Sequence, residues 1–127
     1  MHAMKRTVPL NLCPSYHYAV ELIGRRWTGA IVYLLLQSPA RFSDLHNAIP
    51  GITDPMLSSR LRQLEREGVV ERAVLPGSPV RVQYALTEKG RALAEVTQAI
   101  GDWGHRWLAN ARPAAPPRVR KKPARTA

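Results

Sequence analysis

The segment GITDPMLSSRLRQLEREGVVER, residues 51–72, constrains the fold more than any other part of the sequence. Its three leucines recur at intervals of four and three residues, which places them on one side of a helix. Thr53 is suited to cap the start of this helix, and Gly68 is suited to the left-handed position just after its end. The segment therefore predicts a short helix that is buried on one side and is followed by extended chain.

The side of this helix opposite the leucines is polar and basic. At 100° per residue it carries Pro55, Ser59, Arg62, Gln63 and Arg66. Arginine, glutamine and serine hydrogen-bond to base edges and phosphates, although a solvated helix surface contains the same residue types. The neighbouring elements decide between these two interpretations.

A second short helix and a pair of strands flank this segment. Residues 41–49 predict an amphipathic helix, and the Pro-Gly pair at 50–51 forces a turn. Residues 69–87 predict two strands around PGSP, residues 76–79, where Pro and Gly suit a type II turn. Two short helices followed by a hairpin form a winged helix-turn-helix, a mainly α fold with a small β-hairpin wing. In this fold the second helix enters the major groove of DNA.

Three further helices are expected. Residues 15–24 predict a short helix that ends at Gly24, and residues 27–38 are apolar nearly all round, which is typical of a buried central helix. A last helix, capped by Thr87, is expected to continue to about Asn110. Its apolar residues follow a heptad spacing, and the stripe that they form is too apolar to be left exposed to water. This favours a dimer, although the same side chains could pack within one subunit.

Charge narrows the partners that the chain is expected to bind. The sequence has 127 residues, a net charge of +10 and a pI near 10.9. This excess favours a polyanion, with nucleic acid first and an anionic membrane surface second. We expect one domain at 13–110, between an N-terminal arm at 1–12 and a disordered, basic, Pro-rich tail at 111–127. The tail is either a solvated end or a non-specific DNA arm.

Other classes of protein are not indicated. The sequence has neither a signal-peptide pattern nor an apolar run near the ~20 residues of a membrane span, so we expect a soluble, cytoplasmic protein with no membrane partner. The four histidines lack the spacing of a metal site, and the single cysteine cannot complete a zinc site. No phosphate loop, nucleophile elbow or carboxylate pair is present. We therefore expect no enzyme, metal or cofactor.

The sequence resembles the HxlR family of bacterial winged-helix regulators over roughly residues 13–108. The resemblance rests on these motifs in order: CP at 13–14, IGRRW at 23–27, RFSDL at 41–45, the segment 51–72, VQYALTEKG at 82–90 and DWG at 102–104. It implies a homodimeric transcription factor that binds a pseudo-palindromic operator and dimerises through its first and last helices. It also implies that Cys13 aligns with the cysteine that some members use to sense oxidants or electrophiles.

The sequence departs from the family pattern at several positions. It has Arg25 and Arg26 where Gly-Lys or Asp-Lys is usual, and Asp54 and Pro55 where a polar and a basic residue are common. Gln83 stands where Glu is common. These differences affect the operator that the chain is expected to read and leave the expected architecture unchanged.

Cys13 has two interpretations. It is either a small buried hydrophobic residue or a redox sensor, because the start of a helix favours the reactive thiolate. With no second cysteine in the chain, oxidation would end in an intersubunit disulfide or in a mixed disulfide with a small thiol. A small-molecule or oxidant effector is therefore a possible partner, alongside double-stranded DNA and a second copy of the chain.

These arguments select two sets of residues. The side chains expected to contact DNA are Arg41, Thr53, Met56, Ser58, Ser59, Arg60, Arg62, Gln63, Arg66 and Arg81. Those expected at the dimer interface are Tyr18, Leu22, Leu93, Val96, Ile100, Trp103 and Trp107. Two alternative functions remain: a non-specific architectural DNA-binding protein that relies on the basic tail, and a winged helix that binds an acidic protein. Specific binding predicts discrimination of ~10³-fold or more against random DNA.

Overall fold

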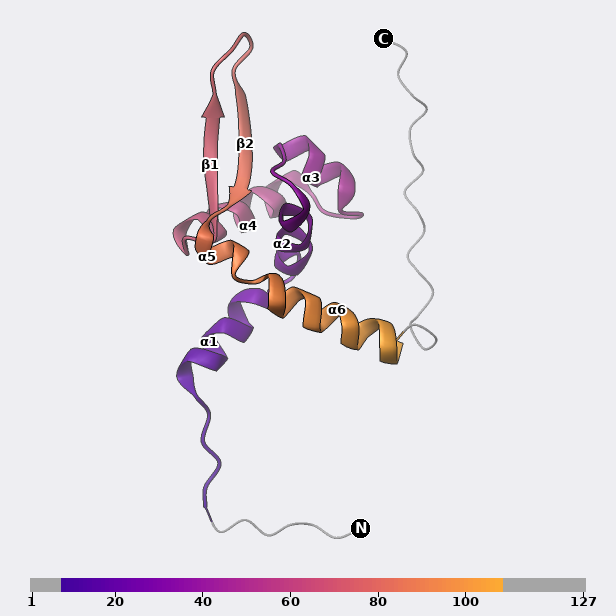
Figure 1. Cartoon of the computed structure of the whole chain (residues 1–127). Helices are drawn as coiled ribbons and strands as arrows, with labels where there is room; N and C mark the ends of the chain where they lie inside the picture. Colours follow the sequence, from indigo (N-terminus) through magenta and orange to yellow (C-terminus); the bar gives the residue numbers. More distant parts are fainter. Residues whose placement is uncertain (1–7, 109–127) are drawn as a thin grey trace.

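The computed structural model describes residues 8–108 of the chain, so the predicted tail and residues 1–7 of the predicted arm lie outside it. The elements in chain order are α1 (Pro14–Ile23), α2 (Thr28–Gln37), α3 (Phe42–Ala48), α4 (Asp54–Arg66), β1 (Val70–Leu75), β2 (Arg81–Leu86), α5 (Glu88–Arg91) and α6 (Ala94–Leu108). Figure 1 shows the hairpin extending from one end of the molecule and α1 and α6 at the opposite end. No helix in this range is long and apolar enough to cross a membrane.

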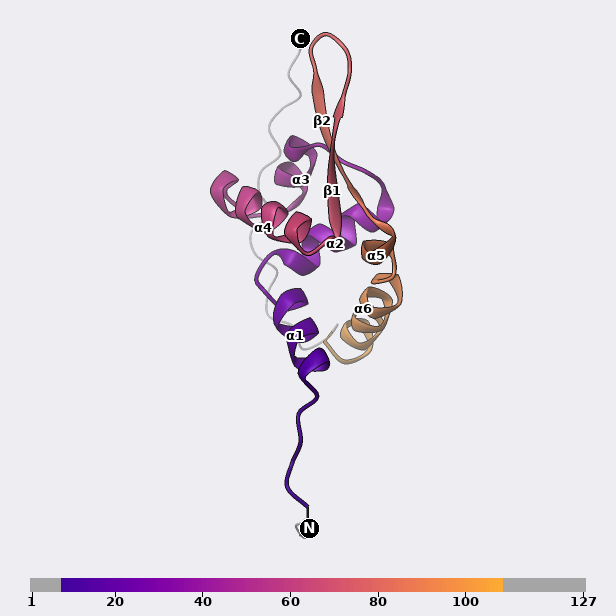
Figure 2. The same ribbon diagram turned by 90° about the vertical axis from the view of Figure 1, so that its left-hand side faces the viewer.

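The hydrophobic core joins α2, α3 and α4 to the base of the hairpin. Its buried apolar side chains are Ile31, Val32, Leu35, Leu45, Ile49, Ile52, Leu57, Leu61, Leu64, Val69, Val70, Tyr84 and Leu86. Neither α1 nor α6 contributes a buried side chain. Figure 2 shows α3 and α4 on the same side of the hairpin, which is the arrangement of a winged helix-turn-helix. The predicted fold class is therefore confirmed.

Both ends of α4 form as the sequence predicts. The Thr53 hydroxyl accepts a hydrogen bond from the Met56 N–H at 3.3 Å. At the other end Gly68 has φ +76°, and its N–H donates to the Glu65 carbonyl at 3.0 Å. The N–H of Val69 donates to the Leu64 carbonyl at 2.9 Å, which completes a Schellman motif. These two caps set the direction in which the chain enters and leaves α4.

The hairpin is antiparallel, with Val70 opposite Leu86 and Leu75 opposite Arg81. The predicted type II turn is wrong, because residues 76–80 all lie between the paired strands and Gly77 has φ +146° instead of about +80°. The second strand begins at Arg81 and not directly after the PGSP segment, so Val80 lies in this connection and is exposed. A two-way backbone bridge between Ala40 and Tyr84, with N–O distances of 3.0 and 2.7 Å, ties the segment before α3 to the hairpin.

The prediction that α2 is buried all round is wrong. One side of the helix, with Thr28, Ile31 and Leu35, is buried, whereas Tyr33 is 57% exposed. The exposed side faces an apolar groove of about 480 Å³ between α2 and α6. The sequence pattern shows that this side is apolar, but it does not show whether the same chain covers it.

The predicted continuous last helix is also wrong. Thr87 does cap it, since its hydroxyl accepts the Gly90 N–H at 3.1 Å. The helix is interrupted after Arg91, and the Leu93 N–H donates to the Gly90 carbonyl in the tighter i to i−3 pattern. Gly90 packs against Val69 and Leu86 without room for a side chain, so α5 stays with the hairpin while α6 turns away from it. The predicted end near Asn110 lies outside the described residues.

Candidate nucleic-acid interface

The outer surface of α4 is held in place by its buried side. Leu57, Leu61 and Leu64 are at most 1% exposed and anchor the helix in the core. The opposite surface carries the predicted contact residues, of which Arg62 and Arg66 are exposed and Ser59 and Gln63 are half-buried. The structure therefore brings these four side chains together on one solvent-facing side of α4.

Two polar contacts orient this surface. Arg62 Nη1 donates to the Ser58 hydroxyl at 2.8 Å, which joins two predicted contact residues one turn apart. At the start of α4, Asp54 lies 3.3 Å from His46 Nε2 of α3. Most of the donors of Arg62 remain free after its bond to Ser58, because a guanidinium carries five N–H groups.

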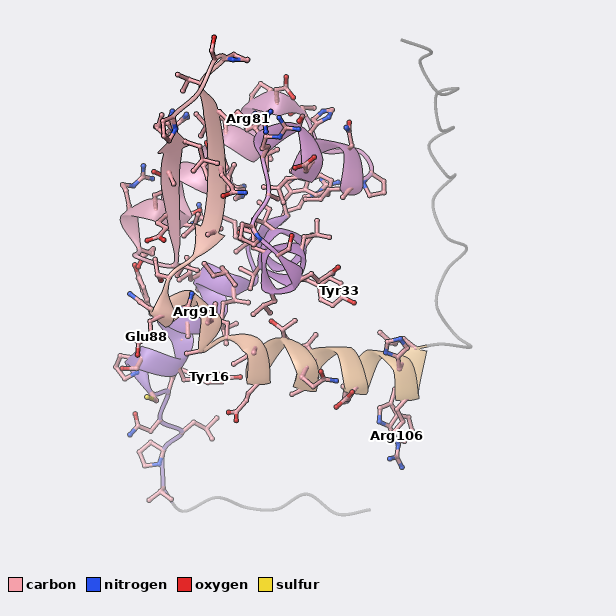
Figure 3. All side chains as sticks on the ribbon, turned by 45° about the horizontal axis from the view of Figure 1, so that its top comes forward. Tyr16, Tyr33, Arg81, Glu88, Arg91 and Arg106 are labelled. Carbon is pink, nitrogen blue, oxygen red and sulfur yellow. The ribbon has the colours of Figure 1, made fainter. Side chains whose placement is uncertain are left out.

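Arg41 and Arg81 lie outside α4. Arg41 precedes α3, and its backbone N–H donates to the Asp44 carboxylate at 2.9 Å. Arg81 begins β2 and is exposed; in Figure 3 it lies on the side of the hairpin that faces α3. Both arginines therefore sit at the hairpin side of α4.

Arg60 extends to the other side of α4. Its Nε donates to the backbone carbonyl of Arg26 at 2.9 Å, in the turn that joins α1 to α2. The guanidinium of Arg26 lies over the Trp27 ring, 4.4 Å from its centroid. Arg60 is among the predicted DNA contacts and Arg26 is not, because no periodicity in the sequence relates the two positions.

Cys13 is exposed and stands immediately before α1 as its N-cap residue. Its interpretation as a buried, inert residue is therefore wrong for the single chain.

One turn further along α1, the Tyr18 hydroxyl donates to the Glu67 carboxylate at 2.5 Å, and this hydrogen bond and the negative charge of Glu67 raise the pKa of Tyr18. Lys89 Nζ donates to the Glu67 carbonyl at 2.6 Å. Glu67 thus connects α1 and α5 to the end of α4, which the sequence did not signal.

The predicted dimer residues form an uncovered apolar surface. Val96, Ile100, Trp103 and Trp107 are between 42% and 59% exposed, and Tyr18 is 59% exposed. Leu22 and Leu93 are half-buried, and Leu93 packs against the core. The alternative in which this surface packs inside one subunit is therefore wrong for the described part of the chain.

No group of three or more His, Cys, Asp or Glu side chains within residues 8–108 is placed to hold a metal ion.

Comparison with known proteins identifies the family. A profile described as HxlR-like helix-turn-helix matches residues 22–112. The HTH-type transcriptional regulator YvaP of Bacillus subtilis is 43% identical over 98 residues, which cover 77% of this chain and 91% of YvaP. The HTH-type transcriptional regulator YodB of the same organism is 45% identical over 93 residues, covering 73% of this chain and 83% of YodB.

Solved structures agree with this similarity. The reduced form of YodB superposes with a TM-score of 0.71 at 42% identity and covers 80% of this chain and 99% of the YodB chain. YodB has also been solved after diamide treatment and with a bound quinone. The oxidised redox regulator HypR gives a TM-score of 0.70 at 35% identity, covering 74% of this chain and 96% of HypR. The chain belongs to the HxlR-like family of helix-turn-helix transcriptional regulators.

Proposed function

We propose that this regulator binds a specific operator as a homodimer, with α4 in the major groove and the hairpin against the adjacent backbone or minor groove. The exposed surface of α4, opposite three leucines that are at most 1% exposed, is the observation that supports this proposal most directly. A helix about 10–12 Å across fits a major groove about 12 Å wide, so its outer side chains reach base edges. Binding to DNA also accounts for the net positive charge of the chain. The proposed regulator acts in the cytoplasm and has no catalytic role.

Arg62 and Gln63 are the side chains proposed to read bases. Arginine pairs with guanine and glutamine with adenine in the major groove, and each bidentate pair discriminates by about 1–3 kcal/mol. The bond from Arg62 to Ser58 fixes the direction of the arginine before binding. Arg41 and Arg81, on the hairpin side of α4, are proposed to contact phosphates and thereby set the position of the helix.

The second copy is proposed to cover the apolar surface of α6. This surface continues into the groove of about 480 Å³, whose walls include Val32, Leu34 and Ile49. Soluble proteins rarely leave such an area in water. A two-fold dimer presents two copies of α4 to half-sites about 34 Å apart, which accounts for a pseudo-palindromic operator.

Selection of fragments from the protein's own genome tests the DNA-binding proposal. We expect the full-length chain and a 1–110 truncation to select the same fragments over random DNA by ~10³-fold or more. We expect Arg62→Ala to reduce this preference by roughly 5- to 150-fold for each half-site, or by roughly 30- to 2×10⁴-fold for a dimer on two half-sites. Arg25→Ala, which removes the same charge from the exposed turn between α1 and α2, outside α4, serves as the control and keeps the preference. Loss of binding by the truncation with no selectivity in the full-length chain would favour the architectural alternative.

Cys13 is proposed as the site of an oxidant or electrophile signal. Its exposure at the start of α1 supports this, as do the relatives named above, one of which is described as a redox regulator and another of which was solved after diamide treatment and with a quinone. The Tyr18–Glu67 hydrogen bond joins α1 to the end of α4. A shift of α1 on modification of Cys13 would therefore also move α4.

Treatment with diamide tests this signal. We expect diamide to change the affinity of the wild-type protein for its selected fragment by roughly 5- to 150-fold, the range of ordinary coupling free energies. Cys13→Ser is expected to bind like the untreated wild type with or without diamide. Equal responses of the two proteins in a gel-shift titration would remove Cys13 from the mechanism.

A further inference from the structure

We propose that Arg26, together with Arg60, forms a phosphate-binding site on the side of α4 that lies opposite the hairpin. The inference rests on the proposed insertion of α4 into the major groove and assigns a contact on the second DNA strand. Arg26 lies outside the helix-turn-helix segment, in the turn that joins α1 to α2. The two guanidinium groups of this site would bind a phosphodiester at one edge of the major groove.

The turn is fixed against α4 by a hydrogen bond from a side chain of α4 to the backbone of the turn. The Arg60 Nε bond of 2.9 Å to the Arg26 carbonyl connects it to the middle of α4, and the Thr28 N–H donates to the Arg25 carbonyl at 3.0 Å within the turn. Trp27 lies against the turn between α3 and α4, 3.7 Å from where a Cβ on Gly51 would stand. The Arg26 side chain therefore starts from a backbone that is held by α4 and lies next to the turn between α3 and α4.

The turn has a strained conformation. Trp27 has φ +78°, in the left-handed region that bulky residues rarely adopt, and this costs about 1–3 kcal/mol. Such strain persists only where surrounding contacts impose it, and it is concentrated at binding and switch sites. In this conformation the Trp27 ring lies under the Arg26 guanidinium, whose central carbon is 4.4 Å from the ring centroid. The ring thereby orients the planar cation before a ligand binds.

The position of the turn matches the second strand of a bound duplex. In Figures 1 and 2 the hairpin extends above α4 and α1 lies below it, so the α1–α2 turn and the hairpin are on opposite sides of α4. A helix in the major groove has a phosphate strand along each of its two sides. The hairpin side carries Arg41 and Arg81, and Arg60 and Arg26 supply the equivalent charges on the other side.

Both guanidinium groups retain donors for a phosphate. Arg60 uses one of its five N–H groups for the Arg26 carbonyl. Arg26 is exposed, and within residues 8–108 its side chain donates no hydrogen bond and makes no ion pair. Arg25, the neighbouring cation, is also exposed, and its charge acts on the Tyr18 hydroxyl, whose pKa it lowers against the larger effect of Glu67. Arg26 differs from Arg25 in that its guanidinium lies over the Trp27 ring and its carbonyl is bound by Arg60, so Arg26 is the cation of this turn that is positioned beside α4.

The salt dependence of binding tests the proposal. Full-length wild type, Arg26→Ala and Arg25→Ala are titrated with a selected genomic fragment and with a random-sequence duplex over a series of KCl concentrations. We expect Arg26→Ala to weaken binding to both DNAs by the same factor. We also expect it to reduce the slope of log K against log salt by about 0.9 for each subunit, or about 1.8 for a dimer. Arg25→Ala removes an equal charge and is expected to change the slope less.

Other results would overturn the proposal. An unchanged slope for Arg26→Ala, or equal changes for both variants, would show that the turn makes no specific phosphate contact. A changed preference between the two DNAs would assign Arg26 to base reading. The denaturation midpoint of each variant shows whether the fold is retained, and Arg26→Lys, which keeps the charge, is expected to recover most of the slope. Failure of the proposed function is recognised separately, because the wild type would then show no preference for the genomic fragment.

Discussion

Ile100→Lys is expected to convert the protein from a dimer to a monomer and to weaken operator binding by about 10²- to 10⁴-fold. Ile100 is 59% exposed in the single chain, so a lysine there costs the protomer little. In the proposed interface the same ammonium group would lose its water without gaining a partner. A monomer binds only one half-site. In a dimer, binding of one α4 holds the second α4 at a high effective concentration near the second half-site, and the loss of this advantage accounts for the expected loss of affinity.

Gln98→Lys is the matched control for this variant. It adds the same charge about 160° around the helix from Ile100, and a lysine there can pair with Asp102, which now accepts the Gln98 amide at 2.9 Å. Sedimentation is expected to show dimers for the control and monomers for Ile100→Lys, with the loss of affinity confined to the latter. A wild-type monomer at micromolar concentration, or a dimeric Ile100→Lys, would contradict the proposed interface.

Gly90→Ala is expected to lower the free energy of unfolding by about 3 kcal/mol. A Cβ at this position would stand 2.2 Å from the Val69 carbonyl oxygen and 3.0 Å from Leu86 Cδ2. The carbonyl cannot move aside freely, because it also accepts the backbone N–H of Thr87 at 3.0 Å. The variant must therefore separate α5 from the base of the hairpin, which also displaces the start of α6.

Gly29→Ala provides the comparison for this substitution. Gly29 lies in α2, and a Cβ there meets nothing within 4 Å. Alanine is expected to stabilise the protein by about 0.4–1 kcal/mol, because it restricts the unfolded chain. Denaturant titrations of both variants should use one protein concentration, since the proposed dimerisation would make stability concentration-dependent. An unchanged midpoint for Gly90→Ala would show that the hairpin base accommodates a methyl group.

Local sequence signals predicted the helix-turn-helix well. The caps at Thr53 and Gly68 and the spacing of the three leucines depend on contacts within a few residues, and the structure contains all of them. The predicted DNA-contacting residues of α4 could be grouped for the same reason, since a helix places every third or fourth side chain on one side. The role of each one in DNA binding stays a prediction.

Signals that depend on distant contacts were interpreted less well. The heptad spacing of the last helix gave no indication of its interruption after Arg91, because the interruption follows from how tightly Gly90 packs on the hairpin. The apolar composition of α2 did not distinguish a side covered by the core from one left open beside α6. The contacts of Arg60 with Arg26, and of Tyr18 with Glu67, join residues 34 and 49 positions apart and have no periodic signature.

By itself, the sequence determined the family, the order of the elements, the ends of α4 and the side chains that its outer surface presents. These follow from local propensity and from a helical period that any helix must obey. Only the tertiary structure decided that α6 separates from α5, that its apolar surface is uncovered in the single chain, and that Arg26 lies beside α4. Those outcomes depend on packing between segments far apart in sequence, such as that of Gly90 against the Val69 carbonyl, which no local pattern encodes.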